Sequence, residues 1–368
     1  MNKKLLLIII VILGMLFIGC EKNDEENGDT PTDIPADPVN VTPPTPQKNN
    51  VQPTATFQAQ GERIKVNLQG LLNPTNNNPI TLFYNSSNPA QSNVFVQQNG
   101  VTKGLLLTKV STGNVLQADV VFIVDNSGSM SEEADNVANN IASFAQTLSS
   151  SGLDVQFACV GYNGWVTGGI NFTTAAELGN YLNRPNITGT RRTEGFAGPD
   201  ATTLESNASG YNGSVWGENG VVASFYADDF YNWRPSAARV IINFTDESTQ
   251  PASDLSFNTA ELCNRLGGVA TVHTVYSGPA DTTRGLNGNW SQNHERPWKM
   301  SECTGGTQKF IAQDASDLVL TDLPVVGALS NSYLVEYMKG SGTVQEWLVR
   351  ILIYTSTADG ETTYRVTY

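Results

Sequence analysis

Apolar and polar residues follow two kinds of pattern along the chain. From residue 55 to 117, short apolar runs are separated by Asn, Pro and Gly, which predicts antiparallel strands. From 118 to 331, apolar runs of strand length alternate with segments whose apolar residues recur at helical spacing, and the strand pattern returns from 332 to 368. We therefore expect an α/β fold with a doubly wound, mostly parallel sheet, inserted in or flanked by a small antiparallel β-sandwich.

The α/β region predicts strands and helices in alternation. The apolar runs expected to form strands are DVVFIVD, DVQFACVGY, RVIINFTD, VATVHTVYS and TQKFIA. The helices are expected at 132–150, 175–183, 217–232, 254–266 and 315–329. In the first of these, Val137, Ile141, Phe144 and Leu148 fall on one face, so this helix should pack against the sheet.

The amino terminus has the features of an export signal. Lys3 and Lys4 precede an apolar run that is too short to span a bilayer as a stable helix, and Cys20 follows it. The sequence LFIGC resembles the lipobox of bacterial lipoproteins. This resemblance implies that residues 1–19 are a signal peptide and that lipidated Cys20 anchors the mature chain to a membrane.

The segment from 20 to 54 is rich in Pro, Asp, Glu, Thr and Asn, which predicts a disordered acidic tether. The acids directly after Cys20 resemble the export signal that sends lipoproteins of Bacteroidetes to the outer face of the outer membrane. A merely solvated acidic linker explains them equally well. We therefore expect an outer-membrane lipoprotein exposed on the cell surface, and a periplasm-facing location remains the alternative.

Charge and cysteine content exclude two classes of function. The chain has 21 basic and 35 acidic side chains, a net charge of −14, so it should not bind nucleic acid through phosphate contacts. Its four cysteines show no Cys-x-x-Cys spacing and it has two histidines, which argues against a zinc site. In an exported protein Cys263 and Cys303 could form a disulfide, with Cys159 as a buried thiol.

Oxygen-bearing side chains follow two of the expected strands. Asp125, Ser127 and Ser129 come after the first α/β strand, and Asp246 and Glu247 come after another. In an open α/β sheet, ligands bind beyond the carboxyl ends of the strands. An all-oxygen set of this kind suits Mg²⁺, Mn²⁺ or Ca²⁺ and is poor for zinc or copper.

This arrangement resembles the von Willebrand factor A domain with its metal-ion-dependent adhesion site, whose hallmark is Asp-x-Ser-x-Ser, then a Thr, then an Asp. The resemblance covers about 118–331 and is carried by DNSGSM and INFTD. It implies that Ser127 and Ser129 bind the ion directly, and that Asp125 and Asp246 hold it directly or through water. It further implies Mg²⁺ (or Mn²⁺ or Ca²⁺) as cofactor and a protein or glycoprotein partner that offers an Asp or Glu carboxylate.

Two parts of the implied site stay open. The segment ITGTRRTEGFAGPDA occupies the place of the family's Thr, and Thr193 is favoured over Thr190. Integrin β-subunits put a Glu in this region, which makes Glu194 an alternative. Glu132 and Glu133 match the paired acids of an adjacent cation site in integrins, although acids that stabilise a helix start through its dipole are the favoured explanation.

We expect a binding protein rather than an enzyme. The sequence has no His-Glu-x-x-His, no Gly-x-Ser-x-Gly and no phosphate-binding loop, and His273 lies in an apolar run as a core histidine would. A structural subunit of a surface fibre or an assembly scaffold, in which the metal only braces the fold, is the main alternative. A hydrolase built from scattered residues is the least supported.

Overall fold

A six-stranded sheet forms the α/β region of the chain. The computed structural model describes residues 33–76, 78–109, 117–163, 166–183, 218–235, 237–251, 255–279, 294–341 and 346–367. The strands of this sheet are β6 (Gln117–Asp125), β7 (Asp154–Tyr162), β8 (Val166–Thr173), β9 (Ala238–Thr245), β10 (Ala270–Ser277) and β11 (Gln308–Ile311). Their order is β11-β10-β9-β6-β7-β8, and every neighbouring pair is parallel except β7 with β8. The predicted α/β fold with a mostly parallel sheet is therefore confirmed.

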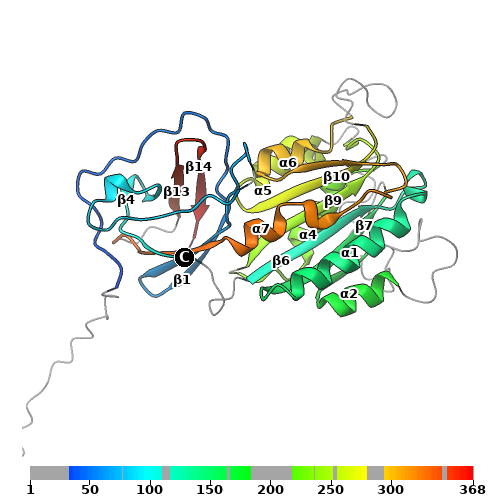
Figure 1. Cartoon of the computed structure of the whole chain (residues 1–368), viewed down its shortest axis with the longest axis horizontal. Helices are drawn as coiled ribbons and strands as arrows, with labels where there is room; N and C mark the ends of the chain where they lie inside the picture. Colours follow the sequence, from blue (N-terminus) through cyan, green and yellow to red (C-terminus); the bar gives the residue numbers. More distant parts are fainter. Residues whose placement is uncertain are drawn as a thin grey trace, which may run out of the picture. The chain divides into compact units, whose positions relative to one another are not determined.

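Helices cover both faces of this sheet (Figure 1). They are α1 (Ala134–Ser149), α2 (Ala175–Leu182), α4 (Gly220–Phe230), α5 (Thr259–Leu266), α6 (Lys299–Thr304) and α7 (Val325–Ser330). One apolar core joins the sheet to α1, α2 and α7, and the other joins it to α4, α5 and α6. The expected face of α1 does pack inward: Val137, Ile141, Phe144 and Leu148 are all at most 1% exposed. Within the described residues, no helix is long and apolar enough to cross a membrane.

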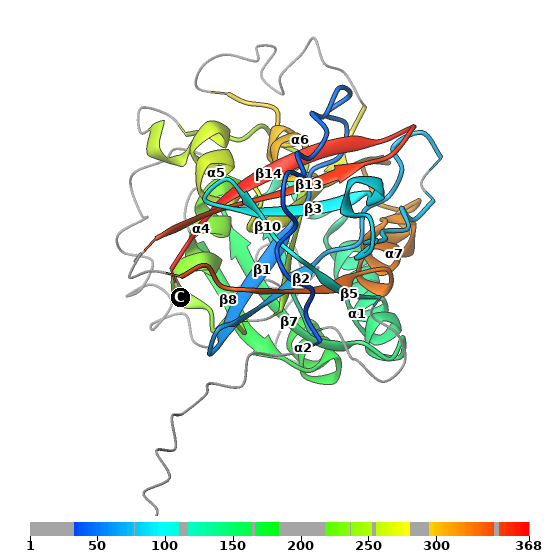
Figure 2. The same cartoon turned by 90° about the vertical axis from the view of Figure 1, so that its left-hand side faces the viewer.

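Two antiparallel sheets combine strands that precede the α/β region in the sequence with strands that follow it (Figure 2). Their strands are β1 (Ala55–Gln60), β2 (Arg63–Leu68), β3 (Val94–Gln98), β4 (Val101–Thr102), β5 (Leu106–Lys109), β12 (Tyr333–Met338), β13 (Trp347–Tyr354) and β14 (Asp359–Val366). One sheet has the order β1-β2-β12-β5 and the other β14-β13-β3-β4. A third apolar core takes alternate residues from both sheets, such as Val66, Val96 and Val335. Four 3₁₀ turns complete the described elements: Pro89–Gln91, Ser129–Ser131, Leu255–Phe257 and Leu320–Asp322.

Residues 33–54, here called the strap, correct the expectation of a disordered tether. Ile34, Pro43 and Pro46 of the strap are buried. The carboxylate of Asp359 in β14 accepts the backbone N–H groups of residues 47, 48 and 49 at 3.1, 2.6 and 2.8 Å. Although burial acts to raise the pKa of Asp359, these three N–H groups together lower it. The strap is held by such backbone bonds and by ion pairs such as that of Asp37 with Lys103, and a polar composition does not reveal these contacts. Residues 20–32 lie outside the described part.

The secondary structure differs from the prediction in three other places. Strand β8 was not expected, because Gly168 and Gly169 interrupt its apolar pattern. Helix α6 was not among the expected helices. The helix expected at 315–329 is instead a series of turns followed by the short α7, because Ala315 has a left-handed φ of 52° and Pro324 begins a new helix.

Candidate functional site

Strands β6 and β9 bring the two aspartates of the motif to one edge of the sheet. The strands are parallel neighbours, with Val124 opposite Phe244, so the residues that follow emerge side by side. Asp125 is the last residue of β6, and Asp246 follows the last residue of β9. Asp125 is fully buried and Asp246 is 6% exposed. Both carboxylates therefore lie at the edge of the sheet where β6 and β9 end, and both are shielded from solvent.

The motif residues form one chain of polar contacts. The hydroxyls of Ser127 and Ser129 lie 2.8 Å apart, and Ser129 donates its hydroxyl to Oδ1 of Asp246 at 3.0 Å. Asp125 accepts the Ser127 backbone N–H on Oδ1 at 2.9 Å and the Thr245 hydroxyl on Oδ2 at 2.7 Å. Residues 117 positions apart in sequence thus meet at this edge, as the sequence pattern predicted.

The donor set fits a small hard cation. Oxygens that occupy neighbouring positions around Mg²⁺, at about 2.1 Å from the ion, are about 3.0 Å apart, whereas Ca²⁺ needs wider spacing. The spacings of 2.8 and 3.0 Å match the smaller ion. Hydrogen bonds give the same spacing, so this geometry is compatible with the ion without requiring it. Among the described residues, no three His, Cys, Asp or Glu side chains converge as a metal site, because two of the four candidate ligands are serines.

Electrostatics favours a cation at this edge. Burial raises the pKa of Asp125 well above its ordinary value, and it also raises the pKa of Asp246. Burial raises the pKa of Glu247 to about 7, and the charges of Glu218 and Asp246 act in the same direction. Among the described residues, no Lys or Arg forms an ion pair with Asp125 or Asp246. The acids of the described site are therefore costly to ionise together, and a divalent cation would offset this excess negative charge.

The two acids considered for an adjacent cation site differ in environment. Glu132 is exposed, whereas Glu133 is fully buried, and neither carboxylate oxygen of Glu133 has a hydrogen-bond partner among the described residues. Burial raises the pKa of Glu133 to about 7, and the charges of Asp246 and Glu132 add to this effect. Glu133 precedes the first residue of α1, where the helix dipole favours a negative charge.

Several residues that support the site were not predicted. Thr245 had a signal, because it directly precedes Asp246 in the motif and lies beside the end of β6. No such signal exists in the sequence for Glu218, because it precedes α4 and belongs to no motif. Only the fold brings it close to the site. Gln250 donates its side-chain amide to Glu218 at 3.1 Å and to Glu247 at 3.5 Å, which ties these two acids together. Asn126 donates its amide to the Thr167 hydroxyl at 2.6 Å, which fixes the turn after β6 to β8.

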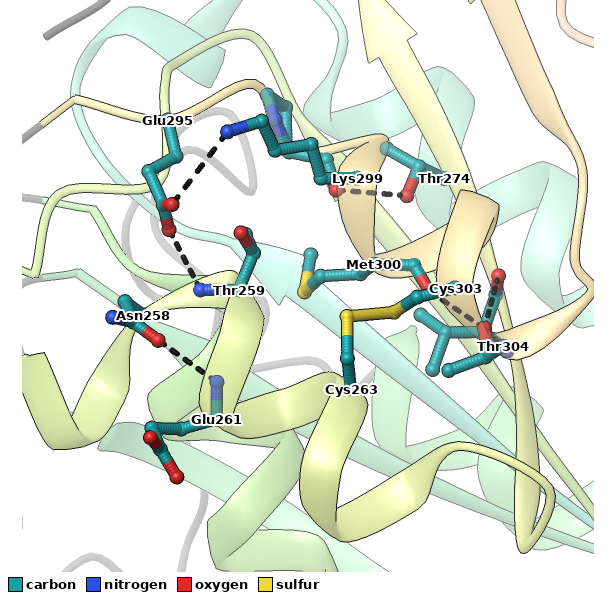
Figure 3. Close-up of a disulfide and its surroundings, with 12 residues drawn as sticks. Asn258, Thr259, Glu261, Cys263, Thr274, Glu295, Lys299, Met300, Cys303 and Thr304 are labelled. Atoms are coloured by element: carbon teal, nitrogen blue, oxygen red, sulfur yellow. Dashed lines mark hydrogen bonds and ion pairs between the residues drawn. A yellow bond between two sulfur atoms is a disulfide. The ribbon is translucent and has the colours of Figure 1, made fainter. Parts of the chain in front are cut away.

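The loop after Asp246 is braced by the segment that precedes α6. Figure 3 shows the contacts of Glu295 in this segment with Thr259 and Lys299. Thr249 and Glu295 exchange backbone hydrogen bonds of 2.9 and 2.8 Å. The Glu295 carboxylate accepts the Thr259 backbone N–H at the start of α5 at 2.6 Å and lies 3.7 Å from the Lys299 ammonium. A disulfide between Cys263 and Cys303, with Cα atoms 5.6 Å apart, joins α5 to α6.

The remaining predicted residues lie outside the described part of the chain. These are Thr190, Thr193 and Glu194 of the third loop, and the lipidation residue Cys20. The suggested pairing of Cys263 with Cys303 is present, and Cys159 is buried outside the disulfide. His273 is a core histidine, 3% exposed, as expected.

Comparison with known proteins gives remote similarities. No protein-family model matches the chain, and no curated protein matches it. One similar solved structure is proximal thread matrix protein 1 from the mussel byssus, with a zinc-occupied MIDAS motif: 14% identity, TM-score 0.39, 65% of this chain and 50% of that chain. Another is the pilus adhesin SpaC from Lactobacillus rhamnosus GG in an open conformation: 11% identity, TM-score 0.37, 88% of this chain and 48% of that chain. The chain thus spans about half the length of each, and this level of similarity decides nothing about its own ion or partner.

Proposed function

We propose that this chain contains a von Willebrand factor A domain and binds an acidic partner through a divalent cation. The single observation that carries the proposal is the convergence of Ser127, Ser129 and Asp246 at 2.8 and 3.0 Å beside the buried Asp125. Residue types that suit Mg²⁺ meet there from two separate strand ends, with no basic side chain paired to either aspartate among the described residues.

Each residue has a defined role in this proposal. Ser127 and Ser129 would hold the ion through their hydroxyls, with Asp125 and Asp246 as the charged ligands or their water-bridged equivalents. Thr245 and the Ser127 N–H keep the Asp125 carboxylate in one orientation, because both of its oxygens accept hydrogen bonds. When bound, the cation supplies the positive charge that attracts a carboxylate of the partner. Thr193, with Thr190 or Glu194 as alternatives, would complete the set.

The proposed partner is a protein or glycoprotein that offers an Asp or Glu side chain. The proposed ion is Mg²⁺, with Mn²⁺ or Ca²⁺ as substitutes. We further propose that Cys20 anchors the chain to the outer membrane and that the described part faces the outside of the cell, with a periplasm-facing position as the alternative. We assign no catalytic role to the contact of 3.1 Å between Ser248 and His294, because the Ser248 side chain is only 1% exposed.

Calorimetric titration of the full chain with Mg²⁺, Mn²⁺ and Ca²⁺ tests the proposal. We expect saturable binding to one site that weakens by at least about 100-fold in Asp125→Asn and Asp246→Asn, since each loses a charged ligand. Glu177→Gln, at an exposed acid on α2, is the matched control and should bind normally. Thr193→Ala and Glu194→Gln show which of the two completes the site.

Two outcomes would count against the proposal. Unchanged affinity in both aspartate variants would place the ion elsewhere. Absence of binding by correctly folded protein would remove the cation bridge and favour the structural-subunit alternative, which concentration-dependent polymerisation in analytical ultracentrifugation would then support.

A further inference from the structure

Glu218 contacts the loop that carries Asp246 from a third element of the fold. It lies two residues before Gly220, the first residue of α4. Its backbone carbonyl accepts the Gln250 N–H at 3.0 Å, and its carboxylate accepts the Gln250 side-chain amide at 3.1 Å. Gln250 lies four positions after Asp246 in the same loop. The segment before α4 is therefore joined to this loop at two points.

The start of α4 also packs against the strands beneath the candidate cation site. Gly220 has no room for a side chain, because a Cβ atom there would lie 2.8 Å from Oδ1 of Asn243 in β9. The same Oδ1 accepts the Tyr162 hydroxyl at 2.9 Å, and Tyr162 lies opposite Asp125 in the pairing of β6 with β7. Helix α4 therefore begins beside the strand ends that carry the two aspartates, and this packing holds Glu218 near them.

The charge of Glu218 acts on both aspartates. Burial is the main cause of the raised pKa of Asp125 and of Asp246, and the negative charge of Glu218 acts in the same direction on each. Among the described residues, no Lys or Arg forms an ion pair with Glu218. These three carboxylates therefore gather near one strand edge without a counter-charge from the described part of the chain.

A third carboxylate changes the charge balance of the loaded site. The charges of Asp125 and Asp246 together equal that of one divalent cation, so with these two alone the loaded site is neutral. With Glu218 it carries one net negative charge. Such a site attracts the cation more strongly, and it attracts the carboxylate of a partner less strongly, because like charges repel.

We propose that Glu218 is the third acid of the cation site: it raises the affinity for the cation and lowers the affinity of the loaded site for a partner's carboxylate. Gln250 is the residue that positions it, through the two hydrogen bonds described above. This inference rests on the proposed function, because it assigns a further residue to the same site.

Titration calorimetry of the full chain with Mg²⁺ measures the first effect. Glu218→Gln should weaken Mg²⁺ binding about 10-fold, whereas Glu261→Gln, at an exposed acid in the first turn of α5, should leave it unchanged. Urea denaturation in EDTA separates this role from a structural one. Without the cation, Glu218→Gln should be at least as stable as the natural chain, because one of several like charges is removed.

Acetate is the probe for the second effect. In protein loaded with Mn²⁺, acetate that binds the ion displaces bound water and lowers the relaxation rate of the water protons. Glu218→Gln should bind acetate about threefold more tightly than the natural chain, with protein in excess so that the ion stays bound.

Gln250→Met tests the positioning role, because it removes the side-chain amide and keeps a similar length. It should weaken Mg²⁺ binding about threefold in the natural chain. In the Glu218→Gln background it should have little further effect, since Gln250 acts through Glu218.

The outcomes separate this inference from the proposed function. Unchanged Mg²⁺ binding in Asp125→Asn would contradict the cation site itself. If Asp125→Asn abolishes binding, full Mg²⁺ affinity in Glu218→Gln would overturn the role of Glu218 alone. Lower stability of Glu218→Gln in EDTA, no gain in acetate affinity, or equal effects of Gln250→Met in both backgrounds would also count against it.

Discussion

Asp119 and Asp125 lie at opposite ends of β6 and are both fully buried, yet their surroundings differ in kind. Asp119 accepts the Arg234 backbone N–H and the Arg234 guanidinium, both at 2.7 Å. Asp125 accepts one N–H and one hydroxyl, and no basic side chain pairs with it among the described residues. Burial raises the pKa of both carboxyls, but Arg234 acts against this shift only at Asp119.

This difference separates a structural acid from a functional one. A buried carboxylate beside an arginine has its counter-charge within the chain, so its role ends with the fold. Asp125 lies where hydroxyls and a second aspartate converge and lacks such a partner. A buried charge of this kind is expected where an external cation completes the site.

The largest expected effect is the loss of stability when Asp119, which pairs with Arg234, is replaced. Asp119→Asn should lower the free energy of unfolding by about 3 kcal/mol, because it removes the buried carboxylate that accepts two hydrogen bonds from Arg234 and leaves Arg234 paired only with the exposed Asp154. Asp125→Asn should change it by less than about 1 kcal/mol in the presence of EDTA, since no internal ion pair is lost. Urea denaturation measures the free energy of unfolding of both variants. Equal losses would contradict the distinction between Asp119 and Asp125.

Magnesium should stabilise the protein only through the site at Asp125, the end of β6 that has no ion pair among the described residues. At a free concentration about 100 times its dissociation constant, Mg²⁺ should raise the free energy of unfolding by about 2.7 kcal/mol. Asp125→Asn should lose this Mg²⁺-dependent stabilisation. Asp119→Asn should keep it, although its free energy of unfolding without Mg²⁺ is lower. Denaturation curves with and without Mg²⁺ give the four values, and a gain retained in Asp125→Asn would contradict the assignment.

The excess negative charge should make stability depend on pH in the metal-free protein. Glu133 has a pKa of about 7 in the folded chain, above the ordinary 4.5. The folded state therefore holds a proton that the unfolded state has lost, and this stabilising contribution disappears as pH rises through 7. Glu133→Gln should remove about 2 kcal/mol of the decline between pH 5 and 8. Stability curves in EDTA test this, and an unchanged slope in Glu133→Gln would show that Glu133 is ionised in both states.

The smallest expected effect concerns the brace on the Asp246 loop. Glu295→Gln should cost about 1 kcal/mol of stability, because a neutral amide oxygen replaces the carboxylate that accepts the Thr259 N–H. The cation affinity should also fall by a fewfold, since the Glu295 carboxylate anchors to α5 the segment whose backbone pairs with Thr249, three residues after Asp246. Glu261→Gln, at an exposed acid of the same helix, is the control for charge alone. Equal effects of the two variants would reduce the brace to a general charge effect.

The elements that the sequence predicted are those with a strong local pattern. Strands β6 and β9 were predicted because long apolar runs end in polar residues, and α1 because four apolar residues share a face. The convergence of Ser129 with Asp246 followed from the rule that parallel strand ends meet at one edge. The sequence was therefore enough to predict that Ser127 and Ser129 lie close to Asp246.

The missed features depend on contacts between distant segments. The strap looked like a tether because its bonds go to Asp359, more than 300 positions later in the sequence. Glu218 reaches the site only because α4 begins beside β9, and the spacing of residues in the sequence does not predict this position of α4. Helix α7 was predicted too long because apolar spacing at 315–329 outweighed the effects of Ala315 and Pro324 on the backbone.

Contacts at the start of the strap set the length of the linker to the membrane, because Asp33 pairs with Arg63 and Asp37 pairs with Lys103. If Cys20 is the membrane anchor, a free segment of 20–54 would give the folded part a reach of up to about 120 Å at full extension. With the strap bound from residue 33, only residues 20–32 remain to span the gap, at most about 45 Å. Opening these contacts together with the three bonds to Asp359 would lengthen this linker by more than twofold, so the distance from the membrane at which a partner can be met depends on how firmly the whole strap is held.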